Sequence, residues 1–332
     1  QPTLVTTPML AARGSAVVPS TVDVFVNGAQ VASQAVPPGP FTIDHVPSIT
    51  GAGQMQVVIT DALGRQQVLS QPYYTGPALL RAGLNEYSFE LGSMRQDYGY
   101  ASNSYGDLVT AATFRRGFTD QVTAEAHVEA QAGGPAAVGL NGAWQMGEFG
   151  ILSATMAAGG VDAMGWLAGF GFEHNGQRAS LFARTQFASE SFAQLGTVEL
   201  ENRPQQRTFV GFGLDFARYG NLQVAYGLQS FWTSRSQETI GVSHALTLGD
   251  FGYLNLIVSQ NIGADTATDV FLNWTMPFGD RRSAAVSLRQ STGVTAGDDF
   301  AAVASVQQSL PAGTGVGYQV SLASNEDAQL GY

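Results

Sequence analysis

The sequence predicts an all-β protein in which a small β-sandwich precedes a large antiparallel transmembrane β-barrel that is incomplete in this chain. From about Leu84 to Leu322, segments of roughly ten residues alternate large apolar side chains with small or polar ones, as barrel strands do. Gly, Asn or Asp turns separate the segments, and their second face holds Gly, Ala, Ser, Asn and Gln with few charges. This pattern is typical of strands with one face toward lipid and the other toward a polar lumen.

The composition limits the possible functions. The 332-residue chain carries a net charge of −11 and has a pI near 4.7, which argues against nucleic-acid binding through a basic patch. Charged residues make up 12% of the chain, about half the share that soluble domains have. No apolar run is long enough for a transmembrane helix. The chain has no cysteine, so neither a disulfide framework nor a thiolate metal site is predicted.

The first hairpin of the predicted sandwich consists of Val22–Val26 and Gln30–Val36, joined at Asn27–Gly28. Asn-Gly between alternating residues is a strong hairpin signal, because both turn positions need a positive φ. The prolines within Pro37–Pro40 cannot donate to a strand ladder. We therefore expect them to break the strand after this hairpin.

A second hairpin follows, with strands at Met55–Thr60 and Gln66–Ser70 and a turn at Asp61–Gly64. Short strands with turn signals at this spacing are typical of a small β-sandwich. The first domain is predicted to cover residues 1–78.

Residues 79–332 are predicted to form the transmembrane barrel segment, with about fifteen strands. The predicted strands span residues 85–95, 107–116, 121–131, 135–146, 150–158, 163–174, 178–188, 207–217, 221–232, 237–247, 251–261, 267–278, 283–291, 300–308 and 315–324. An odd number is unusual for a bacterial single-chain barrel, and the final residues read as the beginning of another strand. We therefore expect an unclosed strand set and a chain that is the middle fragment of a longer protein.

The alternation also assigns faces inside the barrel. Glu125, His127 and Glu129 share one face of a strand, and carboxylates that faced lipid would be expensive, so this face must be wet. The candidate lumen-facing residues are Glu125, His127, Glu129, Glu173, Arg184 and Arg289. Opposite-sign pairing of Arg184 or Arg289 with Glu125 or Glu173 would give a charged lumen wall.

Three stretches resemble the outer-membrane usher family of the chaperone–usher pilus pathway. They are "VDVFVNGAQVASQAVPPGPFTI" (22–43), "GAGQMQVVITDALGRQQVLSQPYY" (51–74) and "LLRAGLNEYSFELGSMR" (79–95). In that family a strand, an Asn-Gly turn and a V-P-P-G-P-F motif mark the plug domain. An L-x-x-G-x-x-x-Y-x-x-x-x-G stretch marks re-entry into the barrel. The stretch "LNWTMPFGDRRS" (272–283) resembles a later usher strand.

The resemblance implies that the sandwich is an Ig-like plug and that residues 79–332 are barrel. It implies a gated channel and assembly platform in the bacterial outer membrane, which translocates folded pilus subunits. The partners implied are periplasmic chaperone–pilin subunit complexes and outer-membrane lipid, with no nucleic acid, no cofactor and no enzymatic activity. Its plug motif corresponds to Asn27, Gly28, Pro37, Pro38, Gly39, Pro40 and Phe41.

Other interpretations remain open. His127 with Glu125 and Glu129 could form a lumen metal site, although a polar lumen wall is favoured. A soluble or surface β-rich adhesin would use the many aromatic residues to bind glycans. An outer-membrane hydrolase is a third possibility, but no G-x-S-x-G nucleophile motif is present. Arg115 and Arg116 end a predicted strand, where they could contact the plug or steer subunits in the lumen, although an interfacial arginine pair is favoured.

Overall fold

The computed structural model describes residues 6–16, 18–27, 29–46, 51–61, 66–97, 99–197, 203–263, 266–279, 281–293, 297–310, 313–325 and 328–331. The chain falls into two compact units, one of Gln1–Gln177 and Phe182–Gln206 and the other of Arg178–Leu181 and Arg207–Tyr332. Apart from two short 3₁₀ turns, Ala217–Tyr219 (η2) and Gly249–Phe251 (η3), the regular structure of the described residues is β-strand. In this described part, no helix is both long and apolar enough to span a membrane.

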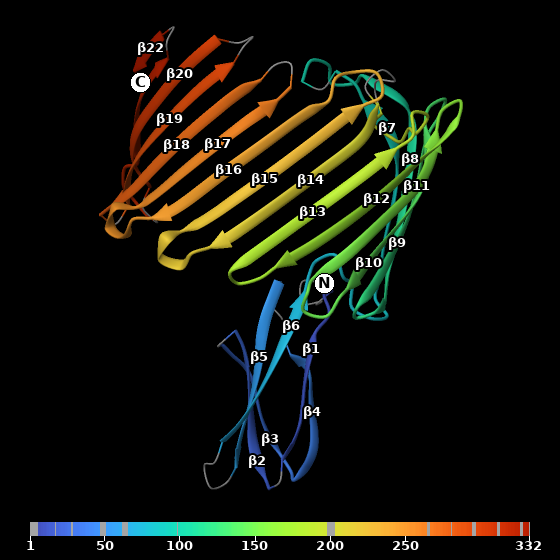
Figure 1. Cartoon of the computed structure of the whole chain (residues 1–332), viewed down its shortest axis with the longest axis vertical. Helices are drawn as coiled ribbons and strands as arrows, with labels where there is room; N and C mark the ends of the chain where they lie inside the picture. Colours follow the sequence, from blue (N-terminus) through green and yellow to red (C-terminus); the bar gives the residue numbers. More distant parts are fainter. Residues whose placement is uncertain are drawn as a thin grey trace. The chain divides into compact units, whose positions relative to one another are not determined.

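The first six strands form two small antiparallel sheets (Figure 1). One sheet pairs β1 (Leu10–Ala16) with β4 (Gly39–Val46). The other has the order β3 (Ala29–Val36), β2 (Ser20–Val26), β5 (Gly51–Asp61) and β6 (Gln66–Thr75).

Buried and more exposed side chains alternate along β2 and β5, and the buried ones form the core between these sheets. Val22 and Val24 are both 0% exposed, whereas the intervening Asp23 is partly exposed. Met55 from β5 and Ile43 from β4 belong to the same buried cluster, so side chains of both sheets meet in one core. The β-sandwich predicted from the period-2 pattern is confirmed.

The Asn27 turn holds β2 against β5 as well as joining β2 to β3. Asn27 has a φ of 50°. Its Oδ1 accepts a hydrogen bond from the Gln54 amide at 2.9 Å, and its own amide donates to the Gln54 carbonyl at 2.9 Å. The predicted partner position, Gly28, lies outside the described residues.

Replacing Asn27 by alanine is expected to destabilise the sandwich by about 1–2 kcal/mol. The variant leaves the Gln54 amide without its side-chain acceptor and puts a residue with no local side-chain hydrogen bond at a positive φ. Hydrogen exchange of the β2 and β5 amides measures the effect. Ser33→Ala on β3, an exposed residue of the same sheet, is the control and should leave exchange unchanged.

Pro37 follows the end of a strand, whereas Pro40 lies within one. Strand β3 ends at Val36, directly before Pro37, as predicted, and Gly39 has a φ of 122° that favours glycine. However, Pro40 lies inside β4, opposite Ser15 of β1. The expectation that Pro40 interrupts a strand is therefore wrong. Among the described residues, β4 pairs with β1 alone, so it is an edge strand, where a missing N–H on the open side is tolerated.

Longer strands make up the rest of the chain. In the first unit these are β7 (Asn85–Arg95), β8 (Tyr105–Thr119), β9 (Val122–Gln131), β10 (Ala136–Gln145), β11 (Ile151–Gly160), β12 (Met164–Asn175) and most of β13 (Ala179–Ala188). The second unit holds most of β14 (Pro204–Asp215), then β15 (Asn221–Phe231), β16 (Gln237–Thr247), β17 (Tyr253–Ile262), β18 (Ala267–Phe278), β19 (Arg282–Gly293), β20 (Gly297–Gln308), β21 (Tyr318–Asn325) and β22 (Ala328–Gly331). Within each unit, those of these longer strands that follow one another in sequence are hydrogen-bonded neighbours (Figure 1).

The described residues after the sandwich thus contain one strand more than the fifteen counted from the sequence. The additional strand is β22, where the sequence indicated the beginning of another strand. Among the described residues, the strand order of this sheet runs from β7 to β22, and these two end strands are not paired with each other. This all-β, antiparallel and unclosed arrangement agrees with the fold predicted from the sequence.

Candidate functional site

The two faces of the sheet in the first unit differ in chemistry. The outer face carries large apolar side chains that are well exposed, with Trp166 54% and Met156 62% exposed. A water-soluble sheet buries such residues, and a contiguous exposed apolar band marks a membrane or protein contact. The exposed residues of this band are Tyr87, Phe89, Leu91, Val128, Val138, Leu140, Trp144, Met156, Trp166 and Phe170.

The inner face is polar. Strand register places Glu125, Asn141, Thr155 and Gly169 in one row across β9 to β12. The Thr155 hydroxyl donates to the Asn141 side-chain oxygen at 2.9 Å. This polar row lies on the face that the alternation of apolar and polar residues predicts to line a lumen.

His127 and Glu129 form a hydrogen-bonded cluster on this inner face. The Thr113 hydroxyl lies 2.8 Å from His127 Nδ1, and Glu129 Oε2 lies 3.0 Å from His127 Nε2. Glu129 Oε1 accepts the amide of Leu195 at 2.8 Å. Both ring nitrogens of His127 are therefore engaged, and the described residues contain no group of three or more His, Asp or Glu that could hold a metal ion. Glu125 shares the face but not this cluster.

The cluster is partly covered by residues 189–197, which follow β13. Phe192 and Ala193 are 8% and 1% exposed. Gly159 and Gly165 lie opposite each other on β11 and β12. A Cβ on Gly165 would lie 2.1 Å from the Phe192 amide nitrogen, so only glycine lets this segment rest on the sheet. The placement of residues 189–197 was not predicted from the sequence. The glycines at positions 159 and 165 are the sequence feature that could have indicated it.

A second segment, residues 74–82, crosses the inner face where it joins the sandwich to the first barrel strand; we call it the strap. Tyr74, Leu79 and Leu80 are at most 3% exposed. The Tyr74 carbonyl accepts a hydrogen bond from Gln145 Nε2 at 2.7 Å. The Tyr74 hydroxyl donates to the Glu173 carbonyl at 3.4 Å and accepts the Asn175 amide at 3.1 Å.

The environment keeps the Tyr74 hydroxyl in its donor form. Burial, and then the neighbouring Glu173 carboxylate, raise the pKa of Tyr74 above its usual value. The ring also stacks on His174, with centroids 5.8 Å apart. Tyr74 is therefore a neutral, buried contact between the strap and the end of β12.

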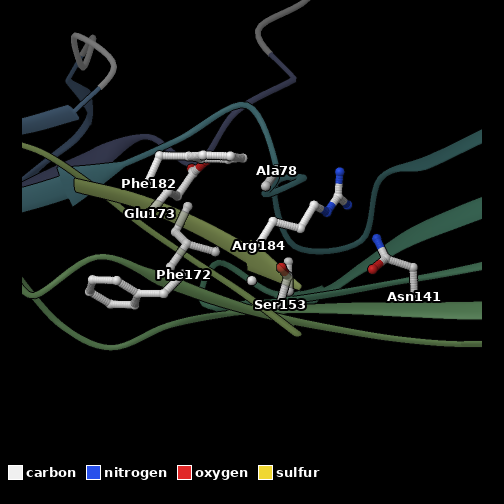
Figure 2. Close-up of a pocket in the computed structure, with 10 residues that line it drawn as sticks. Ala78, Asn141, Ser153, Phe172, Glu173, Phe182 and Arg184 are labelled. Atoms are coloured by element: carbon white, nitrogen blue, oxygen red, sulfur yellow. The ribbon is translucent and has the colours of Figure 1, made fainter. Parts of the chain in front are cut away.

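A pocket of about 140 Å³ lies beside the strap, against β10 to β13 (Figure 2). Its wall combines apolar groups with a carboxylate and a guanidinium: Ala78, Asn141, Ala143, Ile151, Ser153, Gly171, Phe172, Glu173, Phe182 and Arg184. Figure 2 shows the Arg184 guanidinium extending away from the Glu173 carboxylate, so the expected ion pair between them is not formed.

The remaining candidates are separated. Arg289 pairs with Asp269 of the neighbouring strand at 3.2 Å, a partner other than those expected. Among the motif residues of the sandwich, Asn27 accepts a hydrogen bond from Gln177 Nε2 at 3.4 Å, while Phe41 packs against the sandwich core. The plug motif and the inner-face charges thus do not form one compact site.

The sequence alone did not decide what Arg115 contacts. Its guanidinium donates to Glu86 Oε2 at 3.0 Å and to the Pro77 carbonyl of the strap at 3.0 Å. It therefore contacts the segment that follows the sandwich.

Comparison with known proteins places this geometry in a family. The family model described as outer membrane usher protein matches residues 10–330. The chain is 26% identical over 304 residues to the outer membrane usher protein FimC of Bordetella pertussis, covering 82% of this chain and 34% of that protein. It is 25% identical over 278 residues to the F1 capsule-anchoring protein of Yersinia pestis, covering 75% and 32%. The chain thus spans about a third of the length of these curated relatives.

Solved structures share the fold. The P pilus usher PapC translocation pore aligns with a TM-score of 0.53 at 19% identity, covering 96% of this chain and 67% of that one. The Escherichia coli P pilus tip assembly intermediate PapC-PapD-PapK-PapG aligns with a TM-score of 0.61 at 18% identity, covering 97% and 45%. The family model matches nearly the whole chain, and the sheet has the apolar outer face and polar inner face of a membrane barrel. The chain therefore belongs to the outer membrane usher family, and its location is the bacterial outer membrane.

Proposed function

We propose that this chain contributes the plug and barrel strands of a gated channel and assembly platform, which translocates folded pilus subunits delivered by a periplasmic chaperone. The family match over residues 10–330 carries the proposal. The polar inner face supports it, because a protein cargo needs a wet passage through the apolar membrane. The P pilus tip assembly intermediate, in which the usher PapC occurs with PapD, PapK and PapG, supports the proposed partners.

We assign the plug to residues 1–78 and the barrel segment to residues 79–332. The sandwich has its own core, which supports a plug that moves as one body. In this proposal Asn27, Gly28 and Pro37–Phe41 shape the plug, and the lumen wall includes Glu125, His127, Glu129, Glu173, Arg184 and Arg289. The lumen-wall assignment is supported for the residues on β9, β12 and β13, because they lie on the same inner face of the sheet.

The chain is further proposed to work without catalysis and without a cofactor. The family acts as a translocation and assembly platform. Steric gating and a polar passage need no covalent chemistry, and both ring nitrogens of His127 are engaged by Thr113 and Glu129.

Deleting the sandwich tests the gate. Removal of residues 10–73 from the protein expressed from its complete gene is expected to produce a large, steady conductance in planar lipid bilayers, where the intact protein is mostly closed. Pilus subunits should reach the cell surface with the intact protein and not in its absence. Gln56→Ala, which leaves the sandwich in place, is the matched control. Equal conductance of the intact and deleted proteins would rule out the plug.

A further inference from the structure

The strap has two parts, Tyr74 at the end of β6 and residues 77–82, and both contact the sheet. Tyr73 and Tyr74 are adjacent in sequence, yet Tyr73 belongs to the buried core of the sandwich and Tyr74 to a separate cluster with Leu79, Ala143 and Ile151 of the sheet. Because neighbouring side chains of a strand point to opposite faces, β6 ends with one tyrosine in each body. The contact between sandwich and barrel segment therefore includes Tyr74, in addition to the hydrogen bond between Asn27 and Gln177.

The second part of the strap is fastened to β8 and β9. The Leu80 amide donates to the Thr123 hydroxyl at 2.7 Å, and that hydroxyl donates to the Leu80 carbonyl at 3.4 Å. Thr123 is only 2% exposed. Gly117 lies directly opposite Thr123, and a Cβ there would lie 2.3 Å from the backbone oxygens of Leu80 and Arg81. The strap backbone thus rests in a notch that glycine leaves open.

Further hydrogen bonds hold residues 77–82 to the same strands. Arg115 of β8 donates to the Pro77 carbonyl at 3.0 Å. The Ala82 amide donates to Asp120 Oδ1 at 3.0 Å. Lifting this part would expose two buried leucines and leave a buried hydroxyl without partners, which opposes its release.

Gly76 connects the two parts. It is buried, and a Cβ on it would lie 2.6 Å from Ile151 Cδ1 and 2.9 Å from Glu173 Oε1. Glycine has the widest choice of backbone conformation, so this position combines close approach to the sheet with freedom of rotation.

We infer that Gly76 is the pivot of the sandwich, that Tyr74 is a releasable latch holding the sandwich in the position seen here, and that residues 77–82 stay anchored when it moves. This inference rests on the proposed gating function. Tyr74 and Gln145 are then positioning residues. Their contacts with Asn175, the Glu173 carbonyl and each other are hydrogen bonds of ordinary strength at the ends of strands, which one conformational step can break.

Cross-linking measures the latch directly. The chain has no cysteine, so cysteines at Asn27 and Gln177, whose side chains are in contact at 3.4 Å, report the sandwich position through a short bis-maleimide in outer membranes. All variants and the control carry this cysteine pair, so the loss of the Asn27 hydrogen bonds is common to them and cancels in the comparison. In that background Tyr74→Phe is expected to shift the equilibrium between the latched and the released sandwich at least about fivefold toward the released state, because the hydroxyl makes two hydrogen bonds and the loss of one is enough for such a shift. The cross-linking yield should fall with the population of the latched state. Gln145→Met should lower it similarly. Tyr87→Phe, the same substitution at a tyrosine of β7 that is 83% exposed on the outer face, is the matched control and should leave the yield unchanged.

Hydrogen exchange tests the anchor in the same variants. Protection of the Leu80 amide should be retained in Tyr74→Phe, whereas the Asn175 amide should exchange faster. Equal cross-linking in Tyr74→Phe, Gln145→Met and Tyr87→Phe would overturn the latch. Loss of Leu80 protection together with that of Asn175 would overturn the pivot. Neither readout requires channel activity, so failure of the gating proposal in the sandwich deletion is a separate result.

Discussion

Replacing Met156 by arginine is expected to destabilise the folded barrel by about 2–4 kcal/mol in a phospholipid bilayer. Met156 lies in the middle of β11, is 62% exposed, and points outward with Trp166 and Leu140. A guanidinium at this depth must leave water for hydrocarbon or distort the bilayer around it. Urea unfolding of the protein in lipid vesicles, followed by heat-modifiable gel migration, measures the loss.

Thr155→Arg is the matched control for this prediction. Thr155 is the preceding residue of the same strand and lies on the inner face, where its hydroxyl bonds to Asn141. There an arginine meets water, so we expect less than about 1 kcal/mol of destabilisation. Equal effects of the two substitutions would mean that the faces are wrongly assigned. A chain that stays folded and soluble without detergent would favour the adhesin interpretation instead.

Replacing Met55 by alanine is expected to destabilise the sandwich by about 2–5 kcal/mol. Met55 is 1% exposed and packs in the core that β2, β4 and β5 share. Truncation removes apolar contacts and leaves a cavity that the small sandwich closes only in part. Hydrogen exchange of the β2 and β5 amides, in the protein held in detergent, gives the change in free energy.

The control for Met55 is its neighbour Gln56, which points to the other face of β5 and is partly exposed. Gln56→Ala should change the free energy of unfolding by no more than about 0.5 kcal/mol. A similar loss in both variants would contradict the alternation along β5 on which the sandwich core depends. Unchanged exchange in Met55→Ala would show that this core does not stabilise the domain.

Strand positions were readable from the sequence because a sheet with two different environments imposes a period of two on its side chains. The observed β18, Ala267–Phe278, has the predicted bounds. Val22 and Val24 were recognisable as one face of β2 by the same rule. The prediction failed at Pro40, because whether a strand tolerates proline depends on which of its sides has a partner, and one strand's sequence does not reveal its neighbours.

Side-chain pairs across strands were less predictable than faces. The alternation placed Glu173 and Arg184 on the inner face, and both line one pocket there. It could not tell that they remain apart or that Arg289 pairs with Asp269. Register and rotamer decide such pairs, and both depend on neighbouring strands and not on the period within one strand.

The sequence by itself determined the all-β architecture and the two faces of the strands, since these follow from periodicity and turn chemistry that are local to each segment. The family was indicated separately, by motifs that resemble it. Only the tertiary structure decided where the non-repeating segments lie. The strap and residues 189–197 carry no period, and their places depend on notches at Gly117 and Gly165 that exist only once distant strands are side by side. Tertiary contact also gave the adjacent residues Tyr73 and Tyr74 different surroundings. Their side chains point to opposite faces of β6, so Tyr73 is buried in the sandwich core and Tyr74 against the sheet.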